Sequence, residues 1–235
     1  MQRKHFLRLA GLTLGGVALG RVLTACGGGD EAATESATEA LSAAVSPGLD
    51  TDGGVDAPAL SADEVAGLLF MREEEKLAHD VYLALYASSG AKVFSNIVPS
   101  EAAHTEAIRG LLVAHGLEDP AATTPPGVFV DSTLQQLYTD LVAMGQPSLI
   151  DALKVGCLIE EKDIWDIEEK KKRVEGEPDI VSVYDNLLCG SRNHLRAFNK
   201  ALLAAGGVYD QPQYLSLAAW SAIADSDNER CGANG

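Results

Sequence analysis

Acidic and histidine side chains occupy positions where the helical repeat of the sequence calls for core residues. Glu75 is in register with neighbouring apolar residues, and Glu101 and His104 are three residues apart, which places both on one face of a helix. Glu160 and His194 also fall on apolar rows of their segments. Burying such groups is costly unless a cation or a proton compensates them. The pattern therefore predicts a metal centre.

Carboxylate oxygens combined with imidazole nitrogens suit iron or manganese, with zinc as an incidental occupant. We expect two divalent metal ions, because four separate helices each send a ligand inward. The expected ligands are Glu75, Glu101, His104, Glu160, Asp163 and His194. Tyr82 and Tyr184 are candidates for hydrogen-bond donors beside the metals or for a radical relay.

Apolar side chains recur at helical spacing in most of the chain after residue 60, and no alternating strand pattern stands out. The expected helices are 62–88, a second from between Ser95 and Ser100 to Gly116, a short one over 132–144, a third from Pro147 to Lys170, and a fourth over 180–205. Another short helix is expected within 214–223. A long crossover between two helix pairs predicts an all-α, ferritin-like four-helix bundle, with the short extra helix lying between helices 2 and 3.

Several motifs resemble known families. Glu75-x-x-Ala78-x-x-x-Tyr82 and Ser100-Glu101-x-x-His104 resemble the first two helices of rubrerythrins and bacterioferritins. The resemblance implies that Glu75 is a metal ligand and that Tyr82 lies beside the site. A closer resemblance, over residues 61–223, is to an uncharacterised ferritin-like family, the DUF2202 type. Its motifs are Met71 to Ala78, Ser100-Glu101-x-x-His104, Ile159-Glu160-Glu161-x-Asp163-Ile164 and Gly190 to Phe198.

One ligand of the wider superfamily is missing. Its fourth helix carries Glu-x-x-His, whereas the residue three before His194 is Ser191. Asp163 substitutes from the third helix, or Glu161 does so as the less favoured choice, or the site is mononuclear or asymmetric. His79 and His115 are expected at the surface, and the charged run from Glu73 to Lys76, taken alone, resembles a solvated face.

The N-terminus resembles a bacterial lipoprotein signal. Residues 1–25 combine a basic start with an apolar run, and Leu23-Thr24-Ala25-Cys26 resembles a lipobox, so we expect export and lipidation of Cys26. The export route, general secretory or twin-arginine, is left open. Residues 26–60 form an acidic Gly/Ala/Ser tether predicted to be disordered. The bundle is expected over 61–207, and a short helix with a disordered tail over 208–235.

Net charge narrows the choice of partners. The 235 residues carry a formal charge of −16, from 34 acidic and 18 basic residues, and loss of the leader removes four bases and no acid. Such a surface disfavours nucleic acid and attracts cations. The expected partners are the membrane of the cell envelope, through the lipid on Cys26, and a small oxidant such as oxygen or peroxide; a homodimer is left open.

Three functions remain open from the sequence. The protein is an oxidant-consuming di-iron or di-manganese protein, a metal buffer without turnover, or a structural helical lipoprotein.

The helical rise separates Cys157 from Cys189 by too great a distance for a disulfide, so these two cysteines are predicted not to pair. Cys231 is left free or intermolecular.

Overall fold

The computed structural model describes residues 60–174 and 176–232, and its first helix, α1, runs from Ala62 to Ser89. Ser61 begins the helix: its hydroxyl accepts the Glu64 N–H, and the Glu64 carboxylate accepts the Ser61 N–H at 2.6 Å. This capping box satisfies amides that have no partner within the helix. Gly90 ends the helix at φ +67°, a conformation that glycine adopts without strain. Both ends agree with the prediction.

The second helix, α2, spans Lys92–Ala114 and begins earlier than predicted. Its N-terminal turns contain Phe94 and Ile97, which are both buried. Pro99 lies inside the helix, where it removes one backbone hydrogen bond. Burial of two large apolar side chains compensates that loss, and so the helix begins before Ser95.

The remaining helices follow the predicted order. They are α3 (Ser132–Gly145), α4 (Leu149–Lys171), α5 (Pro178–Ala204) and α6 (Leu217–Ala224). Within the described residues the fold is all-α, with six helices and no strand. Side chains of Asp131, Ser148 and Ser216 accept backbone N–H groups at the starts of α3, α4 and α6.

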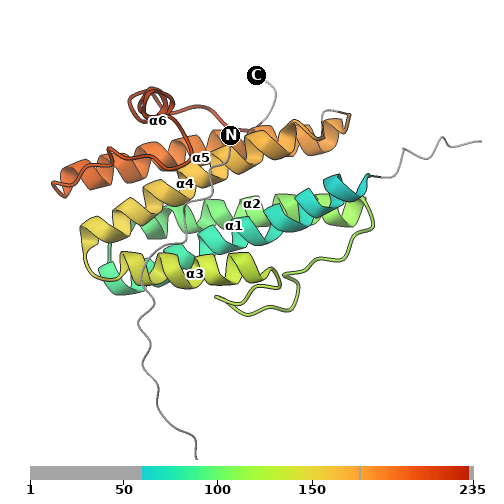
Figure 1. Cartoon of the computed structure of the whole chain (residues 1–235), viewed down its shortest axis with the longest axis horizontal. Helices are drawn as coiled ribbons and strands as arrows, with labels where there is room; N and C mark the ends of the chain where they lie inside the picture. Colours follow the sequence, from blue (N-terminus) through green and yellow to red (C-terminus); the bar gives the residue numbers. More distant parts are fainter. Residues whose placement is uncertain (1–59, 175, 233–235) are drawn as a thin grey trace, which may run out of the picture. The chain divides into compact units, whose positions relative to one another are not determined.

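Helix packing follows the order of the chain. The most extensive contacts join α1 to α2 and α4 to α5, and the two pairs meet where α2 lies against α5 and α1 against α4 (Figure 1). Helix α3 packs on α1 and α4, and α6 packs on α5. Two apolar clusters fill the interior. One surrounds the touching rings of Tyr82, Phe94 and Phe198, and the other includes Met71 and Ile108.

The charged run of α1 is buried, as predicted for Glu75, and does not form the solvated face that the run taken alone resembles. Arg72 donates two hydrogen bonds to Asp119, and the Glu73 carboxylate accepts the N–H groups of Val130 and Asp131 at 2.6 and 2.8 Å. Lys76 binds Asp80 and two backbone carbonyls of the crossover between α2 and α3. Because neighbouring elements surround α1, these charged groups find internal partners.

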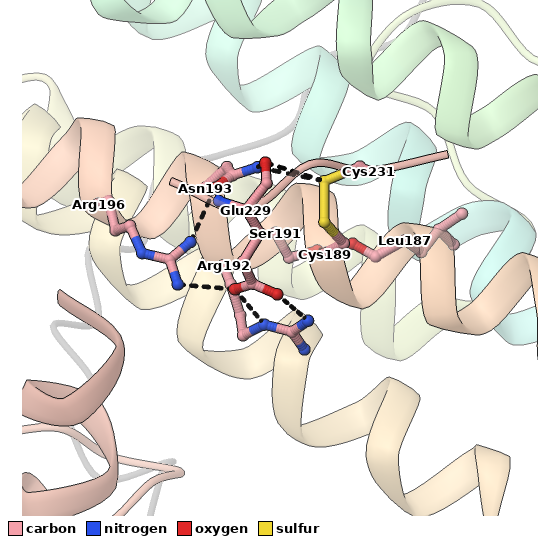
Figure 2. The surroundings of a disulfide bond; sticks show 8 residues. All are labelled: Leu187, Cys189, Ser191, Arg192, Asn193, Arg196, Glu229 and Cys231. Atoms are coloured by element: carbon pink, nitrogen blue, oxygen red, sulfur yellow. Dashed lines mark hydrogen bonds and ion pairs between the residues drawn. A yellow bond between two sulfur atoms is a disulfide. The ribbon is translucent and has the colours of Figure 1, made fainter. Parts of the chain in front are cut away.

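Cys157 and Cys189 do not form a disulfide with each other, as predicted, and Cys157 is buried and free. Cys189 forms a disulfide with Cys231 instead (Figure 2). Cys231 is therefore neither free nor intermolecular, because the chain after α6 folds back onto α5. The expectation of a disordered tail does not hold for residues 225–232, which lie against that helix.

The expected leader, the lipobox at Cys26 and most of the tether lie outside the described residues. Among the residues that the structure does describe, none of the helices combines the length and apolar character needed to cross a membrane.

Glu161 anchors the segment between α5 and α6. Its carboxylate accepts hydrogen bonds from the N–H groups of Tyr214 and Leu215 and from the hydroxyl of Tyr209, at 2.5, 2.7 and 2.7 Å. Replacement of Glu161 by alanine leaves these donors without an acceptor, so we expect the free energy of unfolding to fall by about 2–4 kcal/mol. Urea denaturation measures this loss. The exposed Glu168 on the same helix provides the control, and equal stability of Glu161→Ala and Glu168→Ala would contradict the anchoring role.

Candidate metal centre

A polar layer separates the two apolar clusters. Its members are Glu75 on α1, Glu101 and His104 on α2, Glu160 on α4 and His194 on α5. Each lies between residues of one cluster and residues of the other along its own helix. The three glutamates are 0–1% exposed and the two histidines 8–9%. The helical register that buries the apolar side chains therefore also brings these five groups together.

The layer contains two groups of ligand atoms that share Glu101. Donor atoms of Glu75, Glu101 and His104 lie within 4.8 Å of one another, as do those of Glu101, Glu160 and His194. His104 Nδ1 is 3.3 Å from Glu101 Oε2, and His194 Nδ1 is 2.7 Å from Glu101 Oε1. Each oxygen of Glu101 thus faces a different imidazole, which is the geometry of a bridging carboxylate.

Several oxygen and nitrogen atoms of the layer that could bind a metal lack a hydrogen-bond partner. Glu75 Oε1, Glu101 Oε1 and His194 Nδ1 are buried and unpaired. The last two are close together, yet their orientation is not that of a hydrogen bond. Buried polar atoms are normally paired, because desolvation without compensation is costly. A cation held between these lone pairs satisfies them, so the residues present fit a metal.

The electrostatics of the layer reflect close packing of opposite charges. Burial raises the pKa of Glu160 to about 7, helped by the neighbouring Glu101 and opposed by His194. Burial also raises the pKa of Glu75. For Glu101 the raising effect of burial is outweighed by the two imidazoles, and its pKa lies well below the usual range. Burial lowers the pKa of His194, but Glu160 and Glu101 outweigh it and raise the pKa to about 10.

The two candidate tyrosines differ in their contacts. The Tyr82 hydroxyl donates a hydrogen bond of 2.6 Å to Glu160 Oε1, so it lies beside the ligand atoms and holds that carboxylate. Tyr184 is fully buried in the second apolar cluster, and its hydroxyl has no hydrogen-bond partner. Burial raises the pKa of Tyr184. Of the two, Tyr82 is the one bonded to the layer.

Asp163 is not in either ligand group. Its Oδ2 accepts a hydrogen bond of 2.5 Å from Ser191, and its Oδ1 is buried and unpaired. Burial and the nearby Glu75 carboxylate raise the pKa of Asp163. The other substitute considered, Glu161, is occupied by the segment between α5 and α6. Ser191 and Asp163 therefore bind each other, and neither belongs to a ligand group.

The other two histidines of the helical region lie outside the ligand groups. Both are partly exposed rather than fully solvated: His79 is paired with Asp80, and His115 with Asp179.

Sequence reasoning missed Gly190, which has no side chain and so leaves room for the His104 ring. A Cβ atom on Gly190 would lie 2.5 Å from His104 Nε2, so only glycine fits there. Its place in the motif from Gly190 to Phe198 was the available signal.

Metal binding at this site should compete with protons. His194, with its pKa raised to about 10, carries a proton near neutral pH in the metal-free protein, and a metal must displace that proton. We expect the apparent affinity for Mn²⁺ to rise about tenfold per pH unit for each imidazole proton displaced between about pH 6.5 and 9. Calorimetric titrations at several pH values measure this slope, and an affinity that does not change with pH would contradict it.

Comparison with known proteins gives the family. Residues 64–227 match the family described as "Uncharacterized protein domain (DUF2202)". The chain is 44% identical over 171 residues to "Uncharacterized protein MJ0754" of Methanocaldococcus jannaschii, spanning 73% of this chain and 91% of that protein. The crystal structure of hypothetical protein MJ0754 from Methanococcus jannaschii DSM 2661 is similar, with a TM-score of 0.71 and 42% identity, over 75% of this chain and 100% of that one. The chain therefore belongs to the DUF2202 family.

Proposed function

We propose that this protein binds two divalent cations, iron or manganese, in its polar layer and reacts there with oxygen or peroxide. Glu75 and His104 would hold one cation, Glu160 and His194 would hold the other, and Glu101 belongs to both ligand groups. The observation that carries the proposal is the pair of three-residue ligand groups that share one buried carboxylate. Each group combines oxygen and nitrogen donors without a thiolate, a set that suits these metals.

The arrangement of helices supports a ferritin-like four-helix bundle as the fold of this site. Helices α1, α2, α5 and α4 contact one another in turn, and the long crossover from α2 to α4 carries α3. Bundles of this type build metal sites from inward carboxylates and histidines on facing helices. The proposed centre is asymmetric, because Ser191 stands where the superfamily pattern has a second bridging carboxylate.

The protein residues determine what reaches the centre. When bound, iron or manganese would supply the redox chemistry with an oxidant. The Tyr82 hydroxyl fixes the orientation of Glu160, and the apolar clusters on both sides keep bulk water away. His104 and His194, which are 9% and 8% exposed, are the most exposed residues of the layer, and this small exposure favours a small oxidant over a large organic substrate. The acidic composition of the chain favours the approach of metal cations.

Metal analysis tests the proposal. We expect two equivalents of iron or manganese per chain, and loss of both in Glu101→Gln, because this change removes the charge of the shared carboxylate. The control is Glu106→Gln, an exposed position on the same helix, which should keep both metals. Peroxide consumption by the loaded protein then distinguishes turnover from metal buffering. Equal metal content in the two variants would refute the shared site.

The proposal includes anchoring to the cell envelope through a lipid on Cys26, supported by the three-part leader and lipobox pattern. We expect the wild-type chain, expressed in a bacterium, to be recovered with membranes and to carry a lipid adduct on Cys26 by mass spectrometry. Cys26→Ser should move the protein to the soluble fraction, whereas Cys231→Ser should not. Recovery of an unlipidated wild-type chain in the soluble fraction would contradict the anchor.

A further inference from the structure

The end of the chain is fastened to the outer side of α5 by three kinds of bond (Figure 2). Residues 225–232, called the C-terminal strap below, contain Cys231, which forms the disulfide with Cys189. The Glu229 carboxylate accepts hydrogen bonds from Arg192 and Arg196. The side chain of Asn193 pairs with the backbone of Glu229 in both directions, at 2.8 and 3.0 Å.

The strap holds the part of α5 that contributes to the metal centre. On the helix the strap contacts Cys189, Arg192, Asn193 and Arg196. These residues alternate with inward-facing residues of the same helical turns. Gly190 packs directly against His104 Nε2, Ser191 binds Asp163, and His194 faces Glu101. A shift of these helical turns would therefore move His194 and remove the close fit around His104.

The affected side chains also form the accessible edge of the centre. His104 and His194 are 9% and 8% exposed, whereas Glu75, Glu101 and Glu160 are at most 1% exposed. The two imidazoles are therefore the ligand side chains with the most contact with solvent, and a change in their positions would alter the access of a metal ion to the proposed centre.

We propose that the C-terminal strap is a redox-sensitive latch that positions His194 and slows the release of metal. A dithiol reductant transfers two electrons and two protons to the Cys189–Cys231 bond, giving two thiols and leaving the reductant as a disulfide. Cys231 is exposed, so a reductant can reach the bond. After reduction the strap depends on the Glu229 ion pairs and on its hydrogen bonds with Asn193 and Arg196. In one of the ion pairs the side chains of Glu229 and Arg192 are 34% and 26% exposed. Such partly exposed pairs hold a segment only weakly.

The first test measures metal release and therefore rests on the proposed function. Co²⁺ serves as the probe because its visible spectrum reports the geometry of its ligands. The full chain is loaded with Co²⁺ and mixed with excess chelator. The wild-type disulfide form is compared with wild type that has been reduced with dithiothreitol and desalted under argon. We expect reduction to accelerate Co²⁺ release at least about tenfold and to change its spectrum, because partners outside the ligand shell typically contribute this much to metal affinity.

Two variants identify the cysteines responsible. Cys231→Ser should release Co²⁺ at the fast rate without any reductant and should not respond to reduction. Cys157→Ala lacks the buried free thiol and should respond as wild type does. A reduced wild type with a lower melting temperature but an unchanged release rate and Co²⁺ spectrum would overturn the latch, since the disulfide would then have a structural role alone.

Hydrogen exchange of the metal-free protein separates failure of the latch from failure of the proposed function. We expect reduction to raise amide exchange in residues 187–197 of α5 and to leave α1 unchanged. If Co²⁺ bound neither form, the proposed function would fail, and the exchange data would decide on the latch. Increased exchange confined to residues 187–197 would support it, and unchanged protection would overturn it.

Discussion

Carboxylates enter the interior of this protein together with positive charge or with hydrogen-bond donors, and this compensation shapes the whole helical region. Glu73 and Glu161 are compensated by backbone N–H groups, which fasten the crossover and the segment before α6. Glu74 is compensated by Lys162. The layer around Glu101 differs, because several of its buried donor atoms remain unpaired within the chain. The unpaired atoms of Glu75, Glu101 and His194 lie in this one layer, where the proposed metal ions would compensate them.

The residues that stabilise the fold and the residues of the proposed metal centre lie in separate parts of the same helices. The apolar clusters on either side of the polar layer fix the register of α1, α2, α4 and α5. That register determines which oxygen of Glu101 faces which imidazole. On the outer side of α5, the disulfide and the Glu229 ion pairs hold the turns that carry His194. Packing therefore fixes the layer from within, and the strap is bonded to the outer side of α5.

In our proposal the centre is asymmetric because Ser191 lies three residues before His194, where the wider superfamily that the sequence resembles has a glutamate. Ser191 is too short to bridge two metals, and it donates its hydrogen bond to Asp163 instead. Asp163 consequently does not join either ligand group, although its position on α4 made it a reasonable ligand from the sequence.

Local sequence signals were sufficient for the helices and for most of the layer. Capping at Ser61, termination at Gly90 and the apolar repeat predicted α1, and the same repeat placed Glu75 and Glu101 inward. These features depend on neighbours within a few turns, so the sequence alone determines them. The early start of α2, the burial of the charged run of α1 and the partner of Cys231 depend on segments far apart in the chain. Only the tertiary structure decided those, because compensation of a buried charge and closure of a disulfide require residues that no local repeat brings together.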